Sequence, residues 1–278
     1  STRFLSPIFG NVHHFGFSML FPMTAQSMNS AKELRVIPAV SRVLWVGLFA
    51  CLFPVSPIHA FQQQQVENDL PWDLGTTYVF RYQEQGAIIG SEEFTIQLRG
   101  KVEDGFDVNS TVKLADDEAK YEFKTRLLTT QNGHPVNYSR KAKIDEKLLN
   151  IQNDFQNDMV TVHASGMVRL DQEIKIPKSV FCFDSNLMAS WALLTSFWEL
   201  EPSSKFEIQT FHNSALKINP VQVEVSKEKR FKWNDQVIEG VVCHLDPLNN
   251  NLYFDKTGRL LRVQQGKLVM ELINTASP

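Results

Sequence analysis

The chain has 278 residues, of which 43% are hydrophobic and 11% aromatic, and its 28 basic and 31 acidic side chains give a formal net charge of −3. The apolar content excludes a wholly disordered chain, and the near balance of charge excludes a basic nucleic-acid-binding arm. With 13 glycines and 12 prolines, the sequence is neither collagen-like nor of low complexity.

Residues 28–60 have the three parts of a secretory signal. A basic n-region precedes the uninterrupted apolar run 43–53, and Ala60 is a small residue at the expected cleavage site. The basic residues are Lys32, Arg35 and Arg42. We therefore expect translation to begin at Met28, residues 1–27 to be an upstream segment or fragment end, and the mature chain to be exported. The expected compartment is the periplasm of a Gram-negative envelope.

Two other interpretations of this signal-like segment stay open. A membrane anchor needs an apolar helix of about 30 Å, whereas eleven residues reach only about 16 Å. Processing as a lipoprotein at Cys51 is the second, although Phe49 fits a lipobox poorly. Cleavage after Ala60 would instead leave a mature chain without an integral membrane segment.

The mature part is predicted to be one acidic domain. Because the first 60 residues hold four bases and one acid, the remaining 218 residues carry 24 bases and 30 acids, a net charge of −6. Such a charge disfavours nucleic acid as a partner. Residues 61–75 begin with a run of glutamines and are expected to be a flexible leader. No linker-like segment divides 76–278, which predicts a single β-rich domain.

Alternation of apolar and polar side chains predicts strands through most of 76–278. In the segment 87–98, for example, Phe94 and Ile96 share one face. Segment 136–144 has few apolar side chains and is expected to be an edge strand. The other expected strands are 77–82, 106–114, 121–127, 159–164, 167–176, 206–211, 221–225, 237–245, 252–255, 259–263 and 268–272.

One segment, 184–200, interrupts this rhythm with a predicted helix. Asp184 or Ser185 can cap its N-terminus, and Pro202 follows its end. Because the segment is apolar on most sides and has no basic residue, we expect it to be buried. The predicted fold is therefore mainly β: a single strongly curved antiparallel sheet, half-barrel or clam-like, with one buried apolar helix near 185–200 on its concave face.

Two cysteines remain after cleavage, Cys182 and Cys243. In an exported protein they are candidates for one disulfide, which would contribute about 4 kcal/mol in the chain-entropy model. The alternative is a pair of buried free thiols, because Phe181 and Phe183 flank the first and two valines precede the second. Both possibilities stay open from the sequence.

The C-terminal third contains an aromatic strand at 252–255, a turn at Gly258 with charged neighbours, and a strand that resumes with Leu-x-Arg-Val up to Val263. Together with 240–245, this pattern resembles the closing strands of uncharacterised bacterial envelope proteins, which are β-rich domains of unknown function behind a signal peptide. The resemblance implies a periplasmic, strongly curved antiparallel sheet that wraps the helix or a ligand, and it carries over no catalytic residue.

Catalytic and metal-binding motifs are not evident in the sequence. No nucleophile elbow or phosphate-binding glycine loop is present, and a metal site would need three distant segments to converge. The carboxylate pair Glu92–Glu93 is expected to be exposed. The histidines after residue 60 occur singly: His134, His163, His212 and His244. We therefore predict no catalytic residue, no metal and no cofactor.

The apolar surface of the helix is the most informative feature for function. Its simplest interpretation is the domain core, and its sharper one is a cavity for an apolar ligand. The candidate lining residues recur at intervals of four, three and four: Leu187, Trp191, Leu194 and Trp198. We expect a non-enzymatic protein that binds a hydrophobic small molecule or an envelope protein.

Two alternatives belong to other classes of protein. One is a hydrolase whose site is assembled from scattered strand residues, which a buried histidine beside a carboxylate or beside Cys182 in a cleft would favour. The other is a structural protein of the envelope that assembles through exposed sheet edges.

Overall fold

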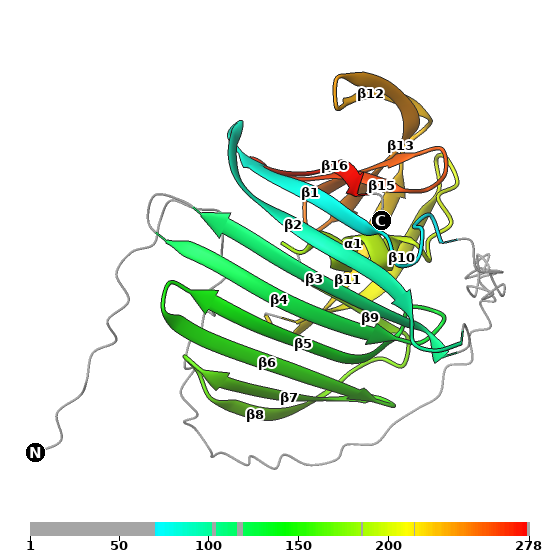
Figure 1. Cartoon of the computed structure of the whole chain (residues 1–278). Helices are drawn as coiled ribbons and strands as arrows, with labels where there is room; N and C mark the ends of the chain where they lie inside the picture. The colour runs from blue at the N-terminus through cyan, green and yellow to red at the C-terminus, as the bar shows by residue number, and fades with distance from the viewer. Residues whose placement is uncertain (1–69, 102–103, 116–118, 185, 214, 277–278) are drawn as a thin grey trace, which may run out of the picture. The chain divides into compact units, whose positions relative to one another are not determined.

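The structure is a computed structural model, and it describes most of the chain beyond the leader (Figure 1). The expected segments 1–27 and 28–60, including Cys51, and most of the leader 61–75 lie outside the described residues. Within the described residues, no helix is both long and apolar enough to cross a membrane. The described ranges are 70–101, 104–115, 119–184, 186–213 and 215–276.

The described part of the chain contains sixteen strands and one helix. The elements before the helix are β1 (Thr77–Glu84), β2 (Ala87–Leu98), β3 (Phe106–Ala115), β4 (Lys120–Thr129), β5 (Pro135–Ile144), β6 (Lys147–Gln156), β7 (Met159–Gly166), β8 (Leu170–Lys175) and β9 (Val180–Phe183). The helix and the later strands are α1 (Met188–Thr195), β10 (Lys205–His212), β11 (Lys217–Val225), β12 (Lys229–Trp233), β13 (Gln236–Asp246), β14 (Asn250–Asp255), β15 (Leu260–Gln265) and β16 (Leu268–Ala276).

All sixteen strands belong to one sheet that does not close. The order is β8-β7-β6-β5-β4-β3-β2-β1-β16-β15-β14-β13-β11-β10-β9, and β12 pairs with β13 beside this path. Neighbours are antiparallel except β9 and β10, which are parallel. The expectation of a mainly β fold with a single large sheet is confirmed. The strand 136–144, expected at an edge, is β5 and lies between β4 and β6, so that expectation was wrong.

Two faces of the sheet follow from the alternation of side chains. In β1, Tyr78, Phe80 and Tyr82 are buried while Thr77 and Arg81 are only half-buried. We call the face of Tyr78 the inner face and the face of Arg81 the outer face. The inner face packs against α1, which contacts β2, β3, β9 and β15.

Helix α1 is shorter than the sequence pattern suggests. All eight of its residues are buried, and no side chain of its N-cap residue, Leu187, bonds to its first turn. The expected cap Asp184 bonds elsewhere, and Ser185 lies outside the described residues. The helix ends at Thr195, whose hydroxyl donates a hydrogen bond to the carbonyl of Trp191 at 2.8 Å. Trp198 therefore lies just after the turn 196–197 that ends the helix.

Candidate functional site

The four residues predicted to line a cavity lie in the apolar core. Leu187, Trp191 and Leu194 are 1 to 3% exposed, and Trp198 is 9% exposed. They are brought together by α1 and the turn that follows it. Their role in binding a ligand stays a prediction.

The N-terminal segment before β1 holds the helix from one side. Trp72 donates its indole N–H to the carbonyl of Ala192 at 3.2 Å and to the hydroxyl of Ser196 at 3.1 Å. Its ring also packs edge-on against Tyr78, with centroids 4.8 Å apart. A tryptophan whose polar atom is satisfied in this way stabilises a core.

Trp198 differs from Trp72 in this respect. Its ring packs edge-on against Phe206 at 5.6 Å, but its indole nitrogen is buried without a hydrogen-bond partner among the described residues. A buried unsatisfied donor costs about 1–3 kcal/mol, so each one in a native structure calls for an explanation. An acceptor atom on a bound molecule would remove that cost.

A carboxylate from the sheet satisfies the first turn of α1. Glu92 in β2 is fully buried and accepts the backbone N–H of Met188 at 2.6 Å and of Ala189 at 3.1 Å. The hydroxyl of Tyr82 donates to the same carboxylate at 2.5 Å. Because the carboxyl oxygens of Glu92 accept these two backbone N–H groups, the first turn of the helix needs no cap from its own segment.

Burial sets the protonation of this pair. Loss of water raises the pKa of Glu92 above its ordinary value of 4.5, against the lowering effect of the bonds that its carboxylate accepts. Burial and the charge of Glu92 raise the pKa of Tyr82 well above its ordinary value. The expectation of an exposed Glu92–Glu93 pair was therefore wrong for Glu92, while Glu93 is exposed.

A second polar cluster joins β5 to the chain that follows β9. Tyr138 donates a short hydrogen bond to Asp184, and Arg140 lies 3.5 Å from the same carboxylate oxygen. The guanidinium also stacks 4.3 Å above the ring of Phe123. Both charged side chains are at most 4% exposed. Such a buried ion pair is held by its geometry and its additional bonds.

His212 lies beside this cluster, so a histidine and a carboxylate do meet in the interior. Its Nδ1 is 3.9 Å from Asp184 and accepts the backbone N–H of Ala215 at 3.0 Å. Burial, as the main cause, lowers the pKa of His212 below 6.5. Because Nδ1 serves as an acceptor, it cannot donate to Asp184 as a histidine general base oriented by a carboxylate does.

The structure does not support the disulfide candidate. Cys182 and Cys243 are both buried free thiols. Cys182 lies in β9 and Cys243 in β13, three steps apart in the strand order. At about 4.8 Å per step they are separated by roughly 14 Å, well beyond the reach of a disulfide. The structure contains the alternative, a pair of buried free thiols.

We expect neither thiol to react with an alkylating reagent at pH 8 while the protein is folded. Burial raises the pKa of Cys182 and of Cys243 to about 12, and only the thiolate is nucleophilic. Labelling followed by peptide mapping should find both residues modified after unfolding and neither before it. A disulfide-linked pair of peptides, or rapid native labelling, would contradict this expectation.

Two hollows lie on the outer side of the sheet, and neither is lined by residues of α1. The first, of about 350 Å³, is lined by Thr77, Glu93, Phe94, Thr95, Asn109, Ser110, Thr111, Lys124 and Thr125. The second, of about 300 Å³, is lined by Arg81, Lys232, Trp233, Asn234, Asp235, Arg262 and Glu271. Sequence reasoning found neither of them.

The architecture defines a single-sheet, mainly β domain with a buried helix. No protein-family model and no curated protein matches the chain. A beta-barrel-like protein of the domain of unknown function DUF1849 from Brucella abortus is similar with a TM-score of 0.47 and 11% identity, covering 72% of this chain and 96% of that chain. A DUF1089 family protein from Pseudomonas aeruginosa gives 0.39 and 11%, covering 63% and 90%. Both are domains of unknown function, and neither likeness is strong enough to assign one here.

Proposed function

We propose that this protein is a non-enzymatic binding protein of the cell envelope, and that it takes an apolar ligand bearing a neutral hydrogen-bond acceptor. The observation that carries the proposal is the buried, unpartnered indole N–H of Trp198 in an otherwise apolar neighbourhood. Small-molecule sites combine apolar walls with a few placed polar groups, and an orphan donor beside a helix end is such a group.

The apolar walls come from the end of α1 and the residues after it. Leu194 is buried in α1, and Phe197 packs against Phe106 with ring centroids 6.1 Å apart. Phe197 also lies over Gly133, where a Cβ would be only 2.3 Å from the ring. The ligand that fits these groups has an aliphatic or aromatic body and an ester, amide or ether oxygen near Trp198.

A strongly curved sheet is part of the proposal. An eight-residue helix is about 12 Å long, yet α1 contacts β3 and β9, which are nine steps apart in the strand order. In a flat sheet nine steps would cover about 43 Å. The bond from Tyr138 in β5 to Asp184 after β9 supports the same curvature. A sheet bent around α1 would enclose the proposed site.

Export is the remaining part of the proposal, and it rests on the sequence alone. The segment 28–60 has the layout of a signal peptide, and cleavage after Ala60 would make Phe61 the first residue of a periplasmic protein. A hydrophobic molecule that crosses an aqueous compartment needs a carrier, and an envelope protein with an apolar interior suits that task.

Replacing Trp198 with phenylalanine tests the proposed site. We expect a neutral medium-chain methyl ester to bind the wild type, and the variant to bind it about fivefold more weakly, because one hydrogen bond of about 1 kcal/mol is lost. The affinity for an alkane of equal length should be the same in both proteins. Quenching of tryptophan fluorescence measures the affinities, and native mass spectra of the exported protein test for a captured molecule.

The stability of the unliganded variants supplies the control. Trp198→Phe removes an unsatisfied donor and should leave the free energy of unfolding unchanged or higher. Trp72→Phe removes a donor with two partners and should lower it by about 1 kcal/mol. Equal ester affinity in wild type and Trp198→Phe, together with a bare polypeptide mass, would refute the proposal.

A further inference from the structure

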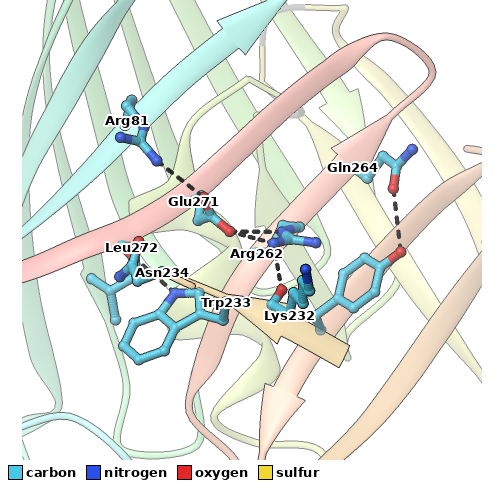
Figure 2. A network of polar contacts seen from close by, with 9 residues as sticks. Arg81, Lys232, Trp233, Asn234, Arg262, Gln264, Glu271 and Leu272 are labelled. Atoms are coloured by element: carbon cyan, nitrogen blue, oxygen red, sulfur yellow. Dashed lines mark hydrogen bonds and ion pairs between the residues drawn. The ribbon is translucent and has the colours of Figure 1, made fainter. Parts of the chain in front are cut away.

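The second hollow lies on the outer face, on the opposite side of the sheet from α1. Three side chains stand next to one another across three strands: Arg81 of β1 pairs in register with Glu271 of β16, which pairs with Arg262 of β15. The tip of the β12–β13 hairpin covers them and completes a pocket of about 300 Å³ (Figure 2).

The hairpin tip is a rigid wall of this pocket. Asn234 and Asp235 form a two-residue loop in which both have positive φ, the geometry of a tight type I′ turn. Trp233 Nε1 and the Asn234 amide both donate to the carbonyl of Leu272, at 2.9 and 3.1 Å. The pairing of β1 with β16 skips Ile273, the residue after Leu272, in a β-bulge. The pocket is thus formed before any ligand arrives.

Positive charge exceeds negative charge among the lining residues. They include three basic side chains and two carboxylates, a net charge of +1 in a chain whose total is −3. Glu271 is 8% exposed and is shared, because one of its oxygens accepts from Arg262 and the other from Arg81 at 3.2 Å (Figure 2). One carboxylate therefore faces two guanidinium groups.

The two arginines are used differently. Arg262 donates to Glu271, donates to the carbonyl of Lys232 at 2.7 Å, and lies 5.3 Å from the centre of the Tyr253 ring. It fastens the hairpin to the sheet. Arg81 makes a single bond to Glu271, and its Nε is buried without a hydrogen-bond partner among the described residues. Arg81 has donors to offer to a ligand.

We propose that this pocket binds an oxyanion, the phosphate or carboxylate group of a small molecule, through the free donors of Arg81 and the charge of Lys232. The planar fork of a guanidinium matches the oxygens of both groups. The volume admits the anionic group together with a few further atoms, which would lie against Trp233. This site is separate from the one proposed at Trp198.

Calorimetric titration of the full-length protein with inorganic phosphate, acetate and glycerol phosphate tests the site. We expect saturable binding that weakens with added salt. Arg81→Met should reduce the affinity at least tenfold, and Arg81→Lys, which keeps the charge without the fork, should reduce it less. The matched control is Arg126→Met, because Arg126 pairs with Asp107 outside the pocket at 2.7 Å and should leave the affinity within twofold.

The source of the anionic group is decided by a second probe. Binding of free glycerol phosphate without binding to phosphatidylglycerol vesicles identifies a soluble ligand, and vesicle binding that Arg81→Met abolishes identifies a lipid headgroup. Circular dichroism checks that each variant folds. If Arg81→Met does not fold, the comparison of Arg81→Lys with wild type tests the proposal. Absence of saturable binding for every probe, or unchanged affinity in the folded Arg81 variants, overturns the proposal.

Discussion

Replacing Asp184 with alanine is expected to lower the free energy of unfolding by about 3–5 kcal/mol. The change leaves Arg140, at most 4% exposed, without its carboxylate, and leaves the hydroxyl of Tyr138 without its acceptor. The cost arises because a buried charge loses one of its partners and gains no water in exchange. Urea denaturation at pH 7 measures the change.

A matched ion pair on the outer face provides the control. Arg126 and Asp107 are 2.7 Å apart, closer than the buried pair, but Arg126 is 55% exposed. Asp107→Ala should cost less than about 1 kcal/mol, because water replaces the lost partner. Comparable losses in Asp184→Ala and Asp107→Ala would show that burial of Asp184 does not set the cost.

Removing the carboxylate of Glu92 is the second change with a large expected effect. Glu92→Ala leaves the N–H groups of Met188 and Ala189 buried without an acceptor, at about 1–3 kcal/mol each. The expected loss is therefore about 2–6 kcal/mol. Glu92→Gln keeps one acceptor oxygen in place and should be less harmful than alanine.

The pH dependence of stability separates the charge of Glu92 from its shape. Its folded-state pKa is raised, so between 4.5 and that raised value the folded state holds a proton that the unfolded state has released. The contribution of Glu92 to stability is thus complete below pH 4.5 and is lost as the pH rises through the raised pKa. Relative to wild type, Glu92→Gln should gain stability across this window.

Denaturation of both proteins from pH 4 to pH 8 measures that difference. Glu93→Gln is the control, because Glu93 is the exposed neighbour of Glu92 and its replacement leaves the bonds from Met188 and Ala189 to Glu92 in place. A difference between Glu92→Gln and wild type that stays constant over the whole range would contradict the raised pKa.

The sequence pattern predicts the sheet well because alternation is a local property. The same alternation also indicates where Glu92 lies. Glu92 precedes Phe94 by two residues and Ile96 by four, so it shares their inner face. Its charge argued for exposure and outweighed the periodicity. The compensating partners, Met188 and Ala189, lie nearly a hundred residues away, and no local pattern indicates that they meet it.

The interior position of β5 could not be predicted for a similar reason. Tyr138 and Arg140 are buried because the chain after β9 lies against them, which depends on how distant strands pack. The predicted end of the helix was wrong for a local reason instead. Apolar spacing continues to Trp198, but the hydroxyl of Ser196 bonds to the carbonyl of Ala192 at 2.7 Å and the next turn tightens.

The pairing of β1 with β16 has a consequence for how the sheet is assembled. The strands β2 to β8 lie on one side of this pair and β15 to β9 on the other, while Arg81 and Glu271 are 190 residues apart in sequence. Because synthesis runs from the N-terminus, β1 cannot pair with its second neighbour, β16, until the intervening strands have been made. Such long-range closure is slow. The nine-residue strand β16 is therefore the element that joins the β1–β8 side of the sheet to the side that runs from β15 to β9.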